Sequence, residues 1–358
     1  MILLFDPDPP IVRIYIGSNN SIQQYDCEMT SDWAAQARNI IGNVEHVRGA
    51  ATLLYHGGNS FQNSITPVTS ETFEKINAAQ KWLPESNEWS KRIAREMYRC
   101  LPGIPHFILC ESAFFSQMPA EAATYAIPFS ITQGGIKRYG SSGLCHQWAW
   151  EKSQTSLSPA PRKVISAQMG NKTSLAAIKD GQAVETTIGF TPVEGILSSM
   201  ACGDIDPTII FHLTASGAEM REINYLLSRE SGFAALLGES CSYRDLMNNK
   251  DEPRYSFIRK ILGYQMIKYI GAFTSILGGV DAIAFSGDPI SESFLFIRDL
   301  CKEMEFLGIH LLAENYEQSG VWRMTEDNSL ARAIGVDYAR PQILIEQIKQ
   351  NITGDEKK

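Results

Sequence analysis

The chain has 358 residues, of which 44% are hydrophobic and 20% charged, so it is long enough for two globular domains with sizeable cores. Its formal net charge of -8 argues against binding to nucleic acid or to an anionic membrane surface, because both need an excess of Lys and Arg. The sequence has neither a long apolar run nor a basic, apolar leader at its start, so we expect a cytoplasmic protein without membrane contact.

Taken in order, the first part of the chain predicts three strands followed by alternating helices and strands. The three strands are predicted at 2–6, 11–17 and 21–27, with a tight DPDPP turn between the first two. The elements predicted after them are a helix near 32–41, a strand at 51–55, helices near 70–80 and 87–100, and a strand at 106–110.

A similar order of elements returns later. The strands of this second series are predicted at 164–168, 175–180 and 183–188. Helices near 207–214, 219–228 and 253–277 and a buried strand at 280–285 are predicted after them. The recurrence indicates two similar α/β domains that face each other across a central cleft.

An acidic segment, GFTPVEGILSSMACGDIDP at 189–207, follows the second series of strands. It contains Glu194, Asp204 and Asp206, is preceded by Glu185, and has no Lys or Arg. Loops rich in Gly and Pro commonly line polar sites, because glycine lets the backbone approach a ligand closely. The sequence alone does not show which positive group these acids face.

Three glycine-containing loops each allow two interpretations. In MGNKTS (169–174), backbone amides and Asn171 can cradle a phosphate, but the same residues are typical of a simple hairpin turn. RYGSSGLCH (138–146) ends in His146, which is either catalytic or a structural histidine. YHGGNS (55–60) permits close approach of a ligand or makes a turn.

Through these loops and several other motifs, the chain resembles the acetate kinase family. The members of this family are the ATP-dependent carboxylate kinases of the actin, sugar-kinase and Hsp70 superfamily. The matching motifs, in chain order, are HGG (56–58), SAFFSQMPAEAATYAIP (112–128), KRYGSSGLCH (137–146), GN (170–171), GFTPVEG (189–195), GDIDP (203–207), SYRDL (242–246), KYIGAF (268–273), LGGVDAI (277–283) and FLGI (306–309). Each motif is weak alone, but the ordered set covers nearly the whole chain.

The resemblance implies a duplicated ribonuclease-H-like α/β fold with two domains and a central cleft. It places residues 1–112 plus about 328–358, with a returning C-terminal helix, in one domain, and 113–327 in a second domain with the nucleotide side and the dimer surface. It also implies a homodimer, ATP or ADP with magnesium as cofactors, a small carboxylate as substrate, and direct in-line transfer of the γ-phosphoryl group.

The family's site positions are partly retained. The retained catalytic positions are Glu111 and His146. The residues expected to bind nucleotide are Gly170, Asn171, Lys172, Tyr243 and Arg244, and those expected in the substrate pocket are His56, Leu83 and Pro192.

Other family positions have lost a cation or a hydrogen-bond donor. Leu53 and Ala201 stand where the resemblance implies arginines, and Ser142 stands where it implies a catalytic histidine. Two further histidine positions are Phe115 and Gln168, and Asp288 or Ile290 replaces a glycine beside the adenine.

The first phosphate loop of the family aligns with the DPDPP turn, residues 6–10. Its three prolines lack amide donors and its two aspartates repel phosphate, so we expect this segment to hold a triphosphate poorly. Asp6, and Glu326 or Asp327, are weak candidate magnesium ligands, or else solvated turn acids.

The main hypothesis is therefore an acetate-kinase-like protein that is catalytically weak or inactive and acts by binding or regulation. The alternative is an active carboxylate kinase with a rebuilt site and a different acid, in which Lys137, Arg138 or Lys172 supplies the missing charge; Lys172 is otherwise an exposed turn residue. A third possibility is a structural partner of an authentic acetate kinase subunit.

Overall fold

The computed structural model describes residues 1–358 except 9, 10, 19, 20, 31, 43, 82, 250, 251, 288, 319, 338, 339 and 356–358. Pro9, Pro10 and Asp288 of the predicted site therefore lie outside the described residues. The chain divides into two compact units, Met1–Ser116 with Ala339–Lys358, and Gln117–Tyr338. The sequence had suggested boundaries at 112/113 and near 328.

The first unit contains a six-stranded sheet with the order β3-β2-β1-β4-β6-β5. The strands are β1 (Ile2–Asp8), β2 (Ile11–Gly17), β3 (Ile22–Glu28), β4 (Gly49–Leu54), β5 (Ile65–Pro67) and β6 (His106–Cys110). β1, β2 and β3 are antiparallel neighbours, whereas β4 runs parallel to both β1 and β6.

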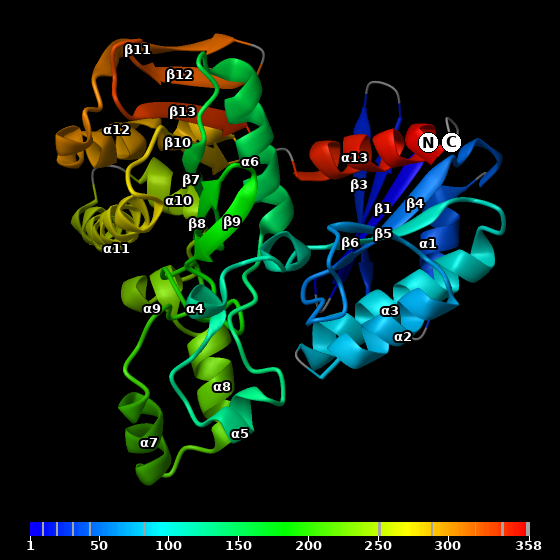
Figure 1. Ribbon diagram of the computed structural model, residues 1–358. Helices are drawn as coiled ribbons and strands as arrows, with labels where there is room; N and C mark the ends of the chain where they lie inside the picture. The colour runs from blue at the N-terminus through cyan, green and yellow to red at the C-terminus, as the bar shows by residue number, and fades with distance from the viewer. Residues whose placement is uncertain are drawn as a thin grey trace. The chain divides into compact units, whose positions relative to one another are not determined.

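Helices cover both faces of this sheet (Figure 1). They are α1 (Trp33–Ile41), α2 (Ser70–Ala79) and α3 (Pro84–Cys100) on one face, and α13 (Arg340–Asp355) on the other. Alternate residues of a strand point to opposite faces, and accordingly Leu3 and Phe5 share a core with Trp33 of α1. On the opposite face, Ile345 of α13 occupies the space that a side chain at Gly17 would need.

The second unit contains a seven-stranded sheet with the order β11-β12-β13-β10-β7-β8-β9. The strands are β7 (Lys163–Gln168), β8 (Ser174–Lys179), β9 (Gln182–Thr186), β10 (Ala282–Gly287), β11 (Leu311–Gln318), β12 (Val321–Thr325) and β13 (Arg332–Asp337). β7, β8 and β9 are antiparallel, and β10 is parallel to both β7 and β13. Five strands thus repeat the arrangement of β1, β2, β3, β4 and β6, which confirms the predicted duplicated α/β fold.

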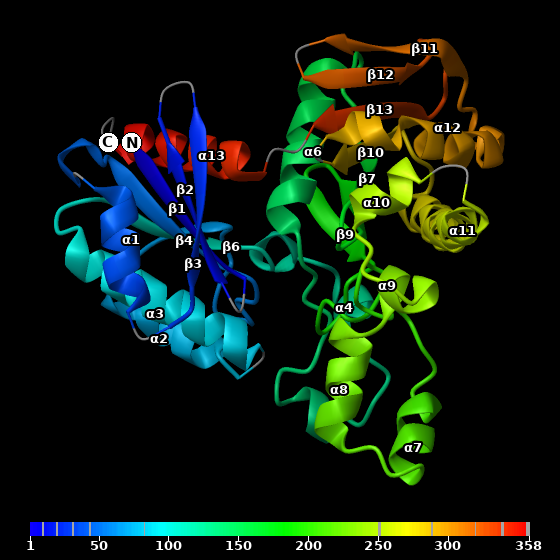
Figure 2. The same ribbon diagram turned by 180° about the vertical axis from the view of Figure 1, so that it is seen from behind.

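Helices also pack on both faces of the second sheet (Figure 2). The long ones are α6 (Gly143–Ser156), α11 (Pro253–Leu277) and α12 (Phe294–Glu303). Ile165 and Phe285 share a core with residues of α11, whereas Val164 and Ala284 share one with Ala149 of α6. The shorter helices are α4 (Ala120–Ala123), α5 (Phe129–Thr132), α7 (Thr208–Ala215), α8 (Met220–Arg229), α9 (Gly232–Leu237), α10 (Tyr243–Asn248) and the 3-10 turn η3 (Ile290–Ser293).

The structure corrects the expected DPDPP turn. Asp6 and Pro7 lie inside β1, paired with Arg13 and Val12 of β2, and only residues 9 and 10 separate the two strands. Pro7 is tolerated because the pairing of β1 with β4 ends at Phe5, so Pro7 has a paired strand, β2, on one side only. β5, α6, β11, β12, β13 and α12 were not predicted, whereas α13 lies where the resemblance implied a returning C-terminal helix. β13 belongs to the second sheet, although the sequence division had grouped residues from about 328 with the first domain.

Candidate functional site

In the first unit, several predicted site residues gather at the carboxyl ends of the parallel strands. β1, β4 and β6 are parallel neighbours, so Asp6, His56 and Glu111 all lie at or just beyond their carboxyl ends. Ligands of α/β sheets commonly bind at the carboxyl ends of the strands. Asp6 and Glu111 are each only 2% exposed, and Asp6 accepts a hydrogen bond of 2.6 Å from the hydroxyl of Tyr55.

The His56–Gly58 turn beyond β4 is held by side chains from two other elements. The amide nitrogen of Asn87, in α3, donates to the carbonyl of His56 at 2.8 Å and to that of Ala79 at 2.9 Å. The backbone N–H of Gly57 donates to the hydroxyl of Ser112 at 2.9 Å. A side chain at Gly57 would lie 2.4 Å from Cys110 Sγ, so this position requires glycine.

Asn87 is a residue that the sequence analysis missed. It is fully buried, and its backbone N–H also donates to the carbonyl of Leu83, the predicted pocket residue, at 3.0 Å. An asparagine inside a predicted helix carries no signal by itself; a buried asparagine that bridges two carbonyls is visible only after folding.

Leu53 occupies the position where the resemblance implies an arginine. It is fully buried in β4, one strand away from Asp6 in the parallel register. The hydrocarbon side chain of Leu53 therefore supplies neither charge nor hydrogen-bond donors at the carboxyl ends of these strands.

In the second unit, the residues expected to bind nucleotide surround the turn between β7 and β8. Asn171 Oδ1 accepts a hydrogen bond of 2.7 Å from the backbone N–H of Tyr243, the first residue of α10. The Tyr243 hydroxyl lies 2.9 Å from that of Ser293, and Arg244 Nε donates to Glu292 at 2.9 Å. The structure thus brings Asn171, Tyr243 and Arg244 together, whereas Lys172 is exposed in the turn.

His146 lies in the interior of the second unit rather than on a surface. Its Nδ1 is 2.9 Å from Ser166 Oγ in β7, and its Nε2 is 3.0 Å from Ser174 Oγ in β8. Complete burial lowers the pKa of His146 to about 3, so the imidazole is neutral at physiological pH. This environment favours the structural interpretation that the sequence left open.

Ser142, at the position where the resemblance implies a catalytic histidine, directly precedes α6. It has a left-handed backbone conformation with φ of 58°, which is uncommon for a residue other than glycine. The polypeptide therefore makes a sharp turn into α6 at this position, but its side chain is a short hydroxyl instead of an imidazole.

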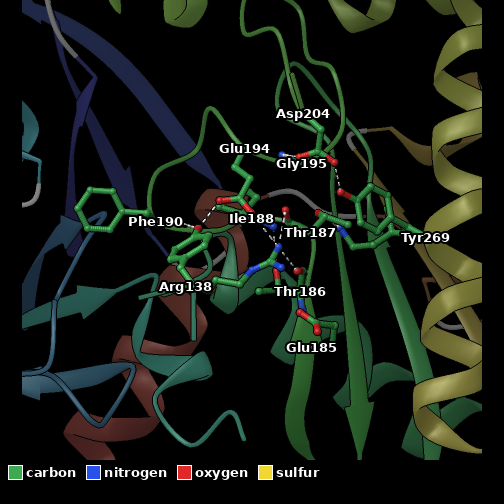
Figure 3. Close-up of polar contacts among 12 residues, drawn as sticks. Arg138, Glu185, Thr186, Thr187, Ile188, Phe190, Glu194, Gly195, Asp204 and Tyr269 are labelled. Atoms are coloured by element: carbon green, nitrogen blue, oxygen red, sulfur yellow. Dashed lines mark hydrogen bonds and ion pairs between the residues drawn. The ribbon is translucent and has the colours of Figure 1, made fainter. Parts of the chain in front are cut away.

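The acidic loop, residues 189–207, has a positive partner that comes from outside it. Arg138 Nη2 lies 3.2 Å from Glu194 Oε1 and donates to the carbonyl of Thr186 at 3.2 Å (Figure 3). The other Glu194 oxygen accepts a hydrogen bond from the Tyr125 hydroxyl, which in turn accepts one of 2.8 Å from the N–H of Phe190. Glu194 is thus bound at both oxygens.

The remaining carboxylates of this region are hydrogen-bonded to amides and hydroxyls. Asp204 accepts from the N–H of Gly195 at 2.9 Å and from the hydroxyl of Tyr269 in α11 (Figure 3). Asp206 accepts from the N–H of Thr208 at 2.9 Å at the start of α7. Burial raises the pKa of Glu185, whose carboxylate accepts from the N–H of Thr186 at 2.9 Å.

The other predicted positions of the second unit are distributed over its loops. Pro192 is half-buried in the acidic loop, and the N–H of Ala201, in the same loop, donates to Ser198 Oγ at 2.9 Å. Glu326 is exposed in the turn after β12. In the described part of the chain, no group of three or more His, Cys, Asp or Glu side chains is placed to hold a metal ion. None of the described helices has the length and apolar character of a membrane span.

The repeated strand order of the two sheets defines a duplicated α/β fold of the actin, sugar-kinase and Hsp70 type. The model of the acetokinase family matches residues 27–337, so the chain belongs to this family. It is 33% identical to the acetate kinase of Halothermothrix orenii over 279 residues, 76% of this chain and 70% of that protein. It is also 33% identical to the acetate kinase of Bacteroides thetaiotaomicron over 278 residues, 76% of this chain and 69% of that protein.

Solved structures agree with this assignment at the level of the fold. The acetate kinase of Porphyromonas gingivalis superposes with a TM-score of 0.84 over 98% of this chain and 99% of that chain, at 22% identity. A propionate kinase from Francisella tularensis gives a TM-score of 0.83 over the same shares, at 21% identity.

Proposed function

We propose that this acetate kinase family member binds a nucleotide or a small carboxylate on the family scaffold but transfers phosphoryl groups weakly or not at all. The observation that carries the proposal is the apolar side chain of Leu53, fully buried near the carboxyl end of β4, between the strand that holds Asp6 and the strand that Glu111 follows. In the family reaction, a carboxylate oxygen bonds to the γ-phosphorus while the bond from that phosphorus to ADP breaks. Charge on the phosphoryl oxygens then needs fixed cations and donors, and Leu53, Ala201 and Ser142 supply no cation.

The β1–β2 hairpin supports the same conclusion. Asp6 and Pro7 are part of a paired strand, so they do not form a phosphate-binding loop. Pro7 has no N–H, and the buried Asp6 carboxylate would repel an anionic phosphate. We therefore expect this part of the first sheet to hold the triphosphate weakly.

The test is an assay of acyl phosphate, trapped as the hydroxamate, with ATP, magnesium and either acetate or propionate. An active kinase would turn over at about 1 to 100 per second. We expect no formation above background, and an authentic acetate kinase would serve as the positive control. Sustained turnover that Glu111→Ala abolishes would overturn the proposal. Calorimetric titration with ATP and with ADP, each with magnesium, measures whether the nucleotide site binds.

The second candidate function is an active kinase with a rebuilt site, and the position of Lys137 favours it. Its ammonium lies 5.0 Å from the centre of the Tyr139 ring, and partial burial lowers the pKa of Lys137. Among the described residues it forms no ion pair, whereas Arg138 is already engaged by Glu194. If a screen of carboxylates and nucleotides finds turnover, Lys137→Met should abolish it while Lys172→Met should not.

The proposal also includes ATP or ADP and magnesium as cofactors, assembly as a homodimer, and a cytoplasmic location. Magnesium prefers oxygen ligands, and Asp6 and Glu326 are the candidate carboxylates for it. Neither belongs to a group of three or more His, Cys, Asp or Glu side chains in the described residues, so we derive no step through the metal. Exposed apolar side chains on α7 and α8, among them Phe211 and Met220, are consistent with a subunit contact. Light scattering in solution measures the oligomeric state.

A further inference from the structure

The acidic loop is fastened by side chains from three separate parts of the second unit. Tyr125 follows α4, Arg138 lies shortly before α6, and Tyr269 belongs to α11. Tyr125 and Arg138 both bind Glu194. Tyr269 binds Asp204, and Figure 3 shows this pair together with Arg138 and Glu194. The loop is therefore anchored near both of its ends.

The Arg138–Glu194 pair is the charged centre of this arrangement. The two side chains are only 21% and 30% exposed, so water and salt screen the pair less than an ordinary surface ion pair. Arg138 also donates to the Thr186 carbonyl at the end of β9. One guanidinium thus ties the acidic loop to the sheet, and hydrogen bonds to charged groups are stronger than neutral ones.

Glycines give the network the space it occupies. A side chain at Gly189 would meet the Glu194 carboxylate at 1.7 Å and the Tyr125 hydroxyl at 2.2 Å. Gly195 has φ of 108°, and a side chain there would meet the Thr187 carbonyl at 2.5 Å. The backbone is therefore shaped around the polar contacts, which indicates one specific loop conformation.

We propose that Arg138 and Tyr125 are positioning residues that act through Glu194 to hold Phe190–Gly195, and with it Pro192, in one preformed conformation. Preorganisation matters because a loop that is already ordered costs no ordering entropy when a ligand binds. The ligand role rests on the proposed function, in which Pro192 lines the pocket for a small carboxylate. The conformational role rests on the contacts alone.

Hydrogen–deuterium exchange of the full-length protein without ligand tests the conformational role. The N–H groups of Phe190 and Gly195 are direct reporters, because their acceptors are Tyr125 and Asp204. We expect Arg138→Met and Glu194→Gln each to speed exchange across 189–195 by about tenfold or more, as loss of a hydrogen bond to a charged group predicts. The effect of the double variant should be smaller than the product of the two single effects, because both changes break the shared Arg138–Glu194 contact.

Arg162→Met is the matched control, since Arg162 forms an exposed ion pair with Asp180 at 2.6 Å elsewhere in the second unit. It should leave exchange across 189–195 unchanged. If Arg138→Met does not fold, Tyr125→Phe removes one hydroxyl and should still speed exchange at Phe190. Unchanged exchange in Glu194→Gln, or fully additive effects in the double variant, would overturn the proposal.

Calorimetric titration with propionate then tests the ligand role. We expect Glu194→Gln to weaken propionate binding while ATP binding stays within about twofold of the wild type, because the nucleotide residues lie around a different turn. Faster exchange with unchanged propionate affinity would overturn the positioning role. A wild type that binds no propionate would count against the carboxylate part of the proposed function, and the exchange data would still decide whether the loop is held by Arg138.

Discussion

The imidazole of His146 lies 2.9 Å from the hydroxyl of Ser166, inside the second unit and away from solvent. Burial stabilises the neutral imidazole over the charged one, which is why the pKa of His146 falls to about 3. A histidine in this state contributes to folding stability in a pH-dependent way.

We predict that the free energy of unfolding decreases as the pH falls below about 6.5. The pKa of His146 is lower in the folded than in the unfolded chain, so the unfolded chain binds the extra proton first. The contribution is complete above about pH 6.5 and is lost as the pH falls toward about 3, at a slope of up to about 1.4 kcal/mol per pH unit. Urea unfolding between pH 7 and 5 measures it.

In His146→Gln, the free energy of unfolding should change less steeply with pH over this range, whatever the absolute stability of the variant. His106 in β6 is still present in this variant, and burial lowers its pKa to about 4. The free energy of unfolding should therefore still depend on pH. His212→Asn, on the exposed surface of α7, is the control and should keep the wild-type slope. An unchanged slope in His146→Gln would contradict the prediction.

A second prediction concerns Asn87. Its side-chain amide donates to the carbonyls of His56 and Ala79 in a fully buried location, so Asn87→Ala leaves two carbonyls without that donor. We expect the free energy of unfolding to fall by about 2 to 4 kcal/mol. Asn87→Asp should be worse, because a carboxylate cannot donate to a carbonyl. Asn77→Ala, on the exposed side of α2, should change stability by less than about 0.5 kcal/mol; equal effects at 77 and 87 would refute the assignment.

The sequence predicted the features that depend on local patterns. The strands from β1 to β4 and from β6 to β10 could be predicted because their apolar residues alternate or form short runs between turn residues. α6 was missed because its buried positions include Gly143, Cys145 and His146, which do not form an apolar stripe of helical period.

Polar partners far apart in the chain could not be predicted. Tyr125 and Glu194 are 69 residues apart, and no local signal links them. The acidic segment therefore appeared to lack a cation, although Arg138 was already visible in a motif of its own. The burial of His146 was equally hidden, because a histidine in a polar glycine-containing loop has the same local sequence whether it faces solvent or the core.

A third prediction uses two glycines with opposite surroundings. Gly189→Ala places a methyl group onto Glu194 and Tyr125, so we expect a loss of about 1 to 3 kcal/mol from overpacking. Gly271→Ala in α11 meets nothing within 4 Å, so we expect a gain of about 0.5 to 1 kcal/mol from better helix propensity. Thermal or urea unfolding of both variants measures the difference, and a neutral Gly189→Ala would show that the Glu194 network is not fixed.

The last prediction concerns restoring a single cation to the acidic loop. Ala201→Arg introduces a guanidinium at one position where the resemblance implies it, but Leu53 and Ser142 stay unchanged. Groups that stabilise one transition state act together and their effects are not additive, so one restored cation should recover little of the rate. We expect Ala201→Arg to form no acyl phosphate above the background of Ala201→Gln, a control that adds a long side chain without charge. Turnover of about 1 per second or more in Ala201→Arg alone, in the range of active kinases, would mean that the other positions are already compensated and would favour the rebuilt active site with Lys137.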